Sequence, residues 1–367
     1  MTFFTVIIIL IVLFILSIFL IDLSLKNLFK NSSSSGQDFL LIKDVKISII
    51  AAAKNETVNI KSLIDSLTEI NYPKDNFEVI IIDDHSSDNT FQIANGLIKG
   101  YNNFSVYHNE NEPSLAKKGA LTFGITKAKF PFIMITDADC NPELSWLKSY
   151  SIRFNKGDDF VFGIAPFYTG KSFISNYSAF ENLRTSILTF SSANLGYPYS
   201  AAARSFGFCK MAFEKIEGYK NTIETLSGDD DLLIREAVKN KLKIGLVIDK
   251  EAFVFSSSKK SIKDYFSQKA RHTKTSFHYL LHQKIILGFW HLLNLVLFFS
   301  PILIFVNIIF VIPFIIKIIF DEALVLTFQK RFGYNFKVGK IIVMQIVYEI
   351  FIVLNFFNAL LRKDKWN

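Results

Sequence analysis

Residues 77–90 read Phe-Glu-Val-Ile-Ile-Ile-Asp-Asp-His-Ser-Ser-Asp-Asn-Thr, and this stretch decides the fold. The run Phe77–Ile82 has the length and the branched side chains of a buried strand. Ser87 and Asp88 are residue types that cap helices, so a helix is predicted over Asn89–Lys99. Asp83 and Asp84 lie between the two elements. A strand, a polar turn and a helix follow each other within this one segment.

The same alternation extends to both sides of this segment. Strands that alternate with helices imply an α/β fold with a mostly parallel sheet covered on both faces. Ligands of such sheets bind outside the carboxyl ends of the strands. The further strands are predicted at Val45–Ile50, Phe104–Tyr107 and Phe130–Thr136, and the further helices at Glu56–Ile70 and Leu115–Lys127.

The composition indicates a polar domain joined to very apolar segments. Half of the 367 residues are hydrophobic, 39 are Phe, and 20% are charged. The net charge of +8 suits anionic lipid or an anionic substrate. No basic patch interleaved with aromatic residues is found, so a nucleic-acid partner is not expected. The two cysteines, Cys140 and Cys209, provide neither a disulfide framework nor metal-ligand spacing.

The N-terminal segment predicts a membrane anchor. Phe3–Ile21 has no charged residue and is long enough to span a bilayer. A signal peptide is disfavoured because no basic residue precedes the run and no small-residue cleavage site follows it. Basic residues follow the span, so the positive-inside rule puts the N-terminus outside and the next domain in the cytoplasm. These residues are Lys26, Lys30, Lys43 and Lys46, and the linker at 31–36 is Ser-rich.

The C-terminal region is apolar but ambiguous in topology. Ile285–Phe320 is long enough for a tight pair of helices, interrupted by two prolines, and Ile341–Leu361 is a further apolar run. The basic stretch Asp321–Lys340 lies between them, and the tail is basic too. If both basic segments are cytoplasmic, the last run is not a simple span, and one region is re-entrant or interfacial. We expect a multi-pass protein of the cell membrane, with an anchor at 1–23, a cytoplasmic domain at 37–284 and a membrane region at 285–367.

The clearest candidate for a metal site is Asp137-Ala138-Asp139, directly after the strand that ends at Thr136. In an extended step, residues i and i+2 point the same way, so two carboxylates can face one divalent cation. Such a cation neutralises a diphosphate leaving group. The alternative is a strand end solvated by two acids, and the position after a buried strand favours the functional interpretation.

Three other clusters contain candidate site residues. Asp83 and Asp84 are suited to accepting hydrogen bonds from a base or a ribose. Lys117 and Lys118 open a helix, where cations oppose the dipole; this indicates either an anion site or two solvated lysines. Three acids, Asp229, Asp230 and Asp231, precede a helix over Leu232–Lys241 and exceed what capping requires, so one of them is a candidate general base.

A basic segment near the second membrane region completes the set. Arg271 offers a planar guanidinium suited to phosphate, and it lies between Gln268 and His272. The alternative is a basic helix that contacts anionic lipid.

Taken in their order along the chain, these motifs resemble those of the inverting family 2 glycosyltransferases with a GT-A fold. The resemblance is to the membrane-bound branch that includes cellulose, chitin and hyaluronan synthases. The resemblance covers roughly Lys46–His272, with apolar segments on both sides. The family has Trp where this chain has His272, and this departure disfavours long processive synthesis. The matching segments are Ser48–Glu56, Val79–Thr90, Lys117–Leu121, Asp137–Asp139, Arg204–Tyr219, Ser227–Leu232 and Gln268–Arg271.

The resemblance implies a metal-dependent transferase that moves a sugar from a nucleotide-sugar, by default UDP-linked, to a saccharide or lipid-linked acceptor. Asp137 and Asp139 would hold Mg²⁺ or Mn²⁺, and Asp229, or its neighbour Asp230, would be the catalytic base. Substrate binding is expected from Glu56, Asp83, Asp84, Lys117, Asp137, Gln268, Arg271 and His272. Two alternatives remain open: a transferase that adds one sugar to a lipid carrier, and a catalytically silent membrane scaffold with the same fold.

Overall fold

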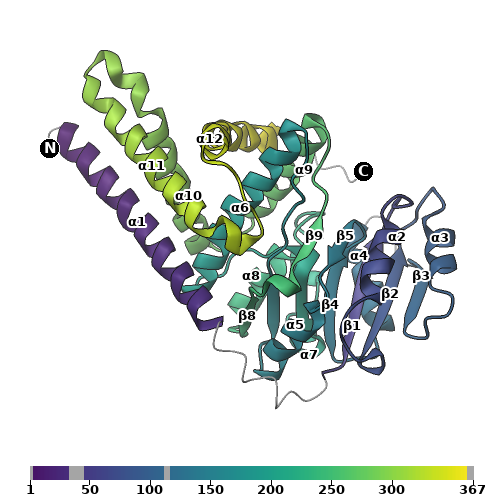
Figure 1. Ribbon diagram of the computed structural model, residues 1–367. Coiled ribbons are helices and arrows are strands. Elements are labelled where there is room, and N and C mark those ends of the chain that lie inside the picture. Colours follow the sequence, from purple (N-terminus) through teal and green to yellow (C-terminus); the bar gives the residue numbers. More distant parts are fainter. Residues whose placement is uncertain (1–2, 33–44, 111–115, 362–367) are drawn as a thin grey trace. The chain divides into compact units, whose positions relative to one another are not determined.

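The computed structural model describes residues 3–32, 45–110 and 116–361, which form two compact units (Figure 1). The sheet unit contains the described residues of Ser32–Tyr168 and Ser200–Ser258. The helical unit contains those of Met1–Asn31, Thr169–Tyr199 and Lys259–Arg362. The two units therefore interleave along the chain. Three sequence predictions concern residues outside these ranges. They are most of the linker at 31–36, the residue Lys43 and the start of the predicted helix at Leu115.

A seven-stranded sheet organises the sheet unit, in the order β3-β2-β1-β4-β7-β6-β8. Its first four strands along the chain overlap the four predicted strands. Strands β1, β2 and β4 are apolar runs that are largely buried, whereas β3 at the edge buries only Phe104. The strands are β1 (Ile47–Ala53), β2 (Phe77–Asp83), β3 (Phe104–His108), β4 (Phe132–Asp137), β6 (Phe160–Gly163), β7 (Phe206–Cys209) and β8 (Ile244–Val247). A second, two-stranded sheet pairs β5 (Cys140–Pro142) with β9 (Val254–Ser256).

The register brings the carboxyl ends of the parallel strands to one edge. Ala53 on β1 is opposite Asp83 on β2, and Asp83 is in turn opposite His108 on β3. On the other side of β1, Ala52 is opposite Asp137 on β4. Strand β7 is antiparallel to both of its neighbours, so the sheet is mostly rather than wholly parallel, as predicted. This edge is where the α/β fold predicts a site.

Helices cover the sheet and approach it closely. Helix α4 packs on β1 and β2, and Gly124 permits the contact, because a Cβ at Gly124 would lie 2.6 Å from Ile50 Cγ2. The helices of this unit are α2 (Ile60–Thr68), α3 (Thr90–Leu97), α4 (Ala116–Lys127), α5 (Trp146–Asn155), α7 (Lys210–Lys215) and α8 (Asp231–Lys239).

Neither predicted residue caps helix α3, because its N-cap residue is Asn89, which makes no side-chain hydrogen bond to the helix. Asp88 Oδ1 accepts hydrogen bonds from the Thr90 backbone N–H at 3.0 Å and from its hydroxyl at 2.5 Å. Ser87 does not cap the helix. Its backbone N–H instead donates to Asn55 Oδ1 at 2.9 Å, which ties the turn after β2 to the turn after β1.

The helical unit is built from long helices. The second apolar region forms a hairpin of α10 and α11, as its length predicts, and short 3-10 turns at Ser300–Phe305 and Ile308–Phe310 connect the two helices. The helices are α1 (Phe3–Ser32), α6 (Phe173–Asn194), α9 (Ile262–Ser276), α10 (Leu281–Phe299), α11 (Val311–Phe328) and α12 (Val338–Leu361), with a 3-10 turn at Gln329–Phe332 before α12.

A buried ionic network joins four of these helices. Lys317 Nζ on α11 lies 2.5 Å from Asp321 Oδ2, 2.8 Å from Glu349 Oε1 on α12 and 2.8 Å from Asn294 Oδ1 on α10. Arg184 Nη2 on α6 lies 3.0 Å from Asp321 Oδ1. The side chains of Lys317 and Asp321 are 0% exposed. Two cations face two carboxylates, so each buried charge has an opposite partner.

We predict that Lys317→Met destabilises the helical unit. The substitution leaves buried carboxylates without their cation, and breaking a buried ion pair costs about 3–5 kcal/mol. The midpoint of thermal unfolding of the purified protein should fall by several degrees. Lys330→Met, which removes an exposed lysine near the end of α11, is the control and should leave the midpoint nearly unchanged. Equal midpoints for the two variants would contradict the stabilising role of the network.

Candidate active site

Lys117 joins two carboxylates from distant parts of the sheet unit. Its Nζ lies 2.6 Å from Asp137 Oδ1, at the end of β4, and 2.6 Å from Asp229 Oδ2, just before α8. The Lys117 side chain is 16% exposed and that of Asp229 is 12% exposed. The predicted alternative of a solvated Lys117 is therefore wrong. We call these three residues the Lys117 triad.

The two carboxylates of the triad stabilise the charged form of Lys117. Burial by itself lowers the pKa of the Lys117 ammonium, but Asp137 and Asp229 more than offset this effect. The result is a pKa well above the ordinary value for lysine, so the ammonium stays charged at neutral pH. The site thus has a permanent cation between two carboxylates.

The turn after β4 gathers three possible metal ligands. One ligand atom each from Asp137, Asp139 and Cys140 lies within 4.8 Å of the others. The carboxylates of Asp137 and Asp139 lie close together, as predicted, but the backbone geometry that brings them together differs from the prediction. Strand β4 ends at Asp137 and β5 begins at Cys140, so a tight turn rather than an extended step brings the carboxylates together.

The donor set fits a hard divalent cation that is held by oxygen. Burial, and then the nearby Asp137 and Asp139, raise the pKa of the Cys140 thiol well above its usual value. The thiol therefore stays protonated and is a poor ligand. Mg²⁺ and Mn²⁺ prefer carboxylate oxygens, which Asp137 and Asp139 provide.

The three consecutive acids have different partners. Asp230 Oδ2 accepts a hydrogen bond from the Ala203 backbone N–H at 2.7 Å, and its Oδ1 accepts one from the Asp231 N–H at 2.7 Å. Asp231 Oδ1 accepts hydrogen bonds from Ser200 Oγ at 2.7 Å and from the Ala201 N–H at 3.1 Å. Asp230 and Asp231 thus fasten the segment 200–203. Asp229 instead faces Lys117.

Gly228 allows this separation of roles. Its φ is +78°, a left-handed conformation that glycine adopts without steric cost. The chain therefore turns sharply just before Asp229, and α8 begins two residues later at Asp231. At Asp230, burial first, and then the charges of Asp231 and Asp229, raise the pKa of the carboxyl well above its usual range.

The predicted acids at the end of β2 are buried and held by the strand beside them. Asp83 Oδ2 lies 3.2 Å from His108 Nδ1, and Asp84 Oδ1 accepts a hydrogen bond from Asn109 Nδ2 at 2.7 Å. The His108 ring stacks on Phe91, with 3.6 Å between the ring centroids. Asp83 Oδ1 is buried and has no hydrogen-bond partner within the part of the chain that the structure describes. A donor group from a ligand would satisfy it.

Glu56 helps to shape the neighbouring turn after β1. Its backbone N–H donates to Thr90 Oγ1 at 2.8 Å, and its Oε2 accepts a hydrogen bond from Asn59 Nδ2 at 2.7 Å. Glu56 thus connects the ends of β1 and β2 through α3. Its predicted contact with a ligand stays a prediction.

Lys118 has a role that the sequence did not reveal. Lys118 is only 6% exposed, so the predicted alternative of a solvated side chain is wrong. Its Nζ donates hydrogen bonds to the backbone carbonyls of Thr222 and Thr225, the latter at 2.9 Å. Burial lowers the pKa of Lys118 to about 8, although nearby acids, first of all Asp229, act in the opposite direction.

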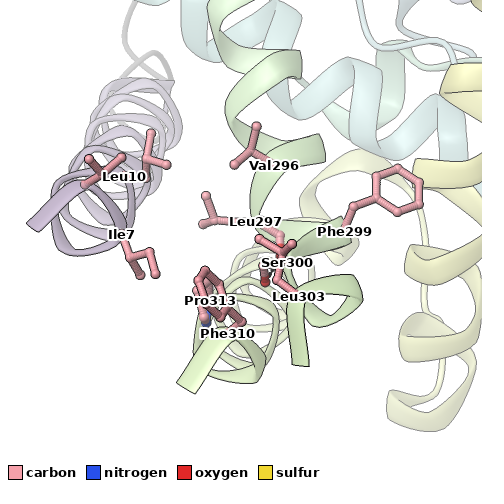
Figure 2. A pocket seen from close by; sticks show the side chains of 10 residues that line it. Ile7, Leu10, Val296, Leu297, Phe299, Ser300, Leu303, Phe310 and Pro313 are labelled. Carbon is pink, nitrogen blue, oxygen red and sulfur yellow. Dashed lines mark hydrogen bonds between the residues drawn. The ribbon is translucent and has the colours of Figure 1, made fainter. Parts of the chain in front are cut away.

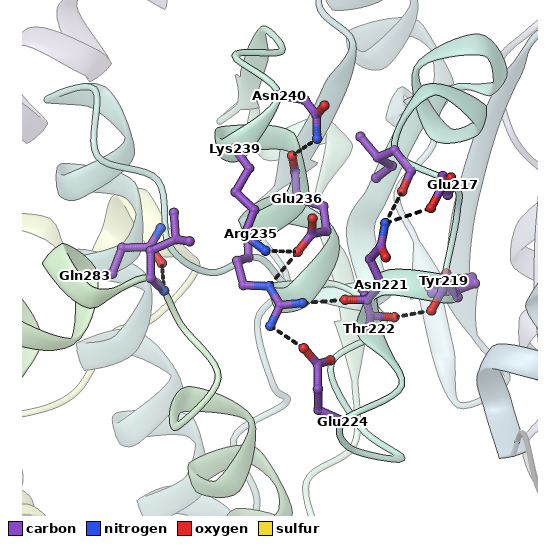
Figure 3. A network of polar contacts seen from close by, with 12 residues as sticks. Glu217, Tyr219, Asn221, Thr222, Glu224, Arg235, Glu236, Lys239, Asn240 and Gln283 are labelled. Atoms are coloured by element: carbon purple, nitrogen blue, oxygen red, sulfur yellow. Dashed lines mark hydrogen bonds and ion pairs between the residues drawn. The ribbon is translucent and has the colours of Figure 1, made fainter.

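Arg235 on α8 fastens the same loop from another side, as Figure 3 shows. Its Nη1 lies 2.9 Å from Glu224 Oε1, its Nη2 donates to the Asn221 carbonyl, and its Nε lies 2.8 Å from Glu236 Oε1. The loop 219–228, which leads into Asp229, is therefore held by two buried cations. No short motif marks the Lys118 contacts, because Lys118 lies 104 residues before Thr222 in the chain.

Arg204 is a further cation in this region that the sequence interpretation did not select. Its guanidinium lies 4.0 Å from the centre of the Phe167 ring and donates to Ser256 Oγ. Ser256 pairs with Cys140 across the β5–β9 ladder, so Arg204 is close to the turn with the possible metal ligands. The electrostatic effect of Arg204 on the Cys140 thiol is consistent with this placement.

The predicted residues Gln268, Arg271 and His272 lie on α9 of the helical unit. The Arg271 carbonyl accepts a hydrogen bond from Thr275 Oγ1 at 3.2 Å, within the helix. Gln268 and Arg271 are partly buried and His272 is exposed. Their part in substrate binding stays a prediction.

Comparison with known proteins agrees with this geometry. Residues 48–217 match the family model "Glycosyl transferase family 2". The chain is 29% identical over 142 residues to glycosyltransferase AglE of Haloferax volcanii, which covers 38% of this chain and 46% of the relative. It is 38% identical over 93 residues to the beta-monoglucosyldiacylglycerol synthase of Trichormus variabilis, or 25% of this chain and 20% of the relative. The chain thus matches less than half the length of each of these relatives.

The fold has a counterpart among solved structures. The mannosyltransferase PcManGT from Pyrobaculum calidifontis, solved in complex with GDP-Man and Mn²⁺, has a TM-score of 0.56 and is 14% identical. The match covers 97% of this chain and 99% of that one. The sheet unit has the GT-A fold, as the sequence predicted.

We predict that Lys118→Met loosens the loop that leads into Asp229. Hydrogen bonds from a charged group contribute about 1.5–3 kcal/mol, so backbone amides of residues 219–228 should exchange with deuterium at least about tenfold faster. Lys99→Met, at an exposed position in the same unit, is the control. Peptide-level hydrogen exchange by mass spectrometry measures the effect. Unchanged protection of the loop in Lys118→Met would show that Lys118 does not hold it.

Proposed function

We propose, from the family 2 match at residues 48–217 and the Lys117 triad, that this chain is a membrane-attached inverting glycosyltransferase. It would transfer a sugar from a nucleotide-sugar to a hydroxyl of a saccharide or lipid-linked acceptor. The observation that carries the proposal is the arrangement of Asp137, Lys117 and Asp229. A possible metal ligand, a fixed cation and a second, largely buried carboxylate meet beyond the ends of the strands.

The donor would lie across the edge where β1, β2 and β4 end. The buried, unpartnered Oδ1 of Asp83 supports binding of a donor group on the base or the ribose, with Asp84 and Glu56 nearby in the adjoining turns. Asp137 and Asp139 would hold Mg²⁺ or Mn²⁺, which neutralises charge on the diphosphate when it is bound. Lys117, which is already cationic, would contact the same diphosphate.

Asp229 is the best candidate for the general base. Asp230 and Asp231 use their carboxylates to hold backbone and side-chain groups of residues 200–203, whereas Asp229 faces the centre of the triad. Asp229 would accept the proton of the acceptor hydroxyl while its oxygen attacks the anomeric carbon. The bond from that carbon to the diphosphate oxygen breaks, and the nucleotide leaves with the electron pair. Attack from the opposite face inverts the anomeric centre.

The apolar helices support the proposed acceptor and membrane placement. Three helices within the described residues are long and apolar enough to cross a membrane, which favours an acceptor that resides in or is made at the membrane. One relative is named as a synthase of a glucosyldiacylglycerol, which supports single addition to a lipid, whereas processive saccharide synthesis is the alternative. Lys26 and Lys30 lie in the last turns of α1 and Lys46 lies beyond it, which supports a cytoplasmic sheet unit.

We predict that Asp229→Asn abolishes sugar transfer and spares donor binding. The amide keeps the shape of the side chain but cannot take a proton, and loss of a general base costs about 10²–10⁴-fold in rate. Purified protein should first be screened against sugar nucleotides with Mn²⁺ by thermal shift and product formation. Asp249→Asn, at an exposed position, is the matched control. Near-normal turnover in Asp229→Asn would contradict the base assignment.

We also predict that Asp139→Ala removes the metal dependence of nucleotide binding. In the wild type, addition of Mn²⁺ should raise the affinity for the nucleotide identified in the screen, because the cation links the carboxylates to the diphosphate. In the variant, titration calorimetry with and without Mn²⁺ should give similar, weak affinities. A variant that keeps the full effect of Mn²⁺ would show that Asp139 is not a ligand. No transfer and no hydrolysis with any donor would instead favour a silent scaffold.

A further inference from the structure

Helix α12 satisfies the length and hydropathy of a membrane span. It is one of three such helices in the described residues, with Phe4–Lys30 and Leu281–Phe305. By composition alone, α12 would therefore cross the bilayer. Its neighbours in the helical unit point to another placement.

The C-terminal half of α12 packs along the polar helix α9. Asn355 Nδ2 donates to Tyr265 Oη at 3.1 Å, and Asn358 Nδ2 donates to the Phe266 carbonyl at 3.0 Å. The Phe356 ring meets the Phe277 ring, with 6.1 Å between their centroids. Charged side chains in the bilayer core are costly, and α9 has five of them in 15 residues. These are Lys263, Asp264, Lys269, Arg271 and Lys274. The C-terminal half of α12, which α9 accompanies, is therefore unsuited to the hydrocarbon core.

The N-terminal half of α12 packs on α6, which is also polar. Lys340 Nζ lies 2.6 Å from Asn176 Oδ1, and the Arg184 guanidinium lies 5.5 Å from the centre of the Tyr348 ring. Near the middle of α12, Glu349 reaches Lys317 of the buried ionic network. One side of α12 therefore meets polar partners from its beginning to its end.

The α10–α11 hairpin runs in another direction. In Figure 1, α12 lies crosswise to the hairpin within the helical unit. The tip of the hairpin and the start of α1 line one apolar pocket of about 280 Å³. Figure 2 shows Ile7 and Leu10 from α1 and Leu303 and Phe310 from the tip. Phe305 at the tip is 97% exposed, and residues 300–310 include no charged side chain. The hairpin and α1 are thus the elements suited to enter the bilayer.

The opposite side of α12 is an apolar stripe. Exposed residues recur every three or four positions, so they form one continuous face of the helix. These are Val343, Ile346, Ile350, Leu354 and Phe357. A helix with polar contacts on one side and such a stripe on the other matches a helix that lies in the membrane interface.

We propose that α12 does not cross the bilayer but lies in its interfacial plane, with this stripe seated in lipid. The segment before α12, with Lys330, Arg331 and Lys337, then lies on the same side of the membrane as the end of α12 at Leu361. This placement does not depend on the proposed enzymatic activity.

Thiol labelling of the full chain in membrane vesicles tests the topology. Val338→Cys and Leu361→Cys, made separately with Cys140 and Cys209 replaced by Ser, mark the two ends of α12, which are 53% and 85% exposed. Met211→Cys, which is 76% exposed in the sheet unit, marks the sidedness of the vesicles. With a reagent that does not cross membranes, both ends should react from the same face. Reaction of the two ends from opposite faces would overturn the proposal.

A second variant tests whether α12 crosses the bilayer if labelling at either end is too weak. Ile350→Lys places a charge on the exposed stripe, near the middle of α12. In an interfacial helix the lysine side chain extends until its ammonium group reaches water. At the centre of a transmembrane helix, inserting the charged lysine costs about 2.5–3.5 kcal/mol. Membrane-integrated protein should therefore stay near the wild-type level. Val12→Lys, on the lipid-exposed side of α1, is the positive control. An equal loss in both variants would show that α12 spans the membrane.

Discussion

The ammonium group of Lys117 is the contact on which the candidate site depends. It lies 2.6 Å from a carboxylate at the end of β4 and 2.6 Å from another that precedes α8. Without a cation between them, two carboxylates this close together would repel each other and would be difficult to bury. Lys117 therefore makes the acidic site possible in the free protein. A diphosphate and a divalent cation would compete for the same charges, which links donor binding to the environment of Asp229.

The surroundings of the triad show how the fold controls one carboxylate among three. Asp230 and Asp231 accept hydrogen bonds from the segment 200–203, and Gly228 provides the left-handed turn that directs Asp229 elsewhere. Lys118 and Arg235 hold the preceding loop through backbone carbonyls. These contacts are structural, but their effect is chemical, since a base must be placed to within a fraction of an ångström to accept a proton efficiently.

The helical unit uses polar contacts for a different purpose. Its buried ionic network joins α6, α10, α11 and α12, and the polar residues of α12 connect it to α9. Such groups would be costly if they faced lipid, and they are satisfied only because the helices pack against one another. Many apolar side chains also face outward, among them Leu16, Leu292 and Ile350. Composition alone describes these helices as apolar, whereas the packing shows which face of each is polar.

The sequence by itself determined the strand and helix alternation, the parallel edge and the acids placed on it. Runs such as Phe77–Ile82 and Phe132–Thr136 are local signals, and parallel pairing necessarily brings their carboxyl ends together. The tertiary structure decided which acid faces Lys117, why Lys118 is buried and how α12 is partnered. Each of these depends on a group far away in the chain, namely the backbone of residues 200–203, the loop 219–228 or the polar helix α9. No local pattern encodes such partners, because burial and hydrogen bonding between distant segments arise only when the chain has folded.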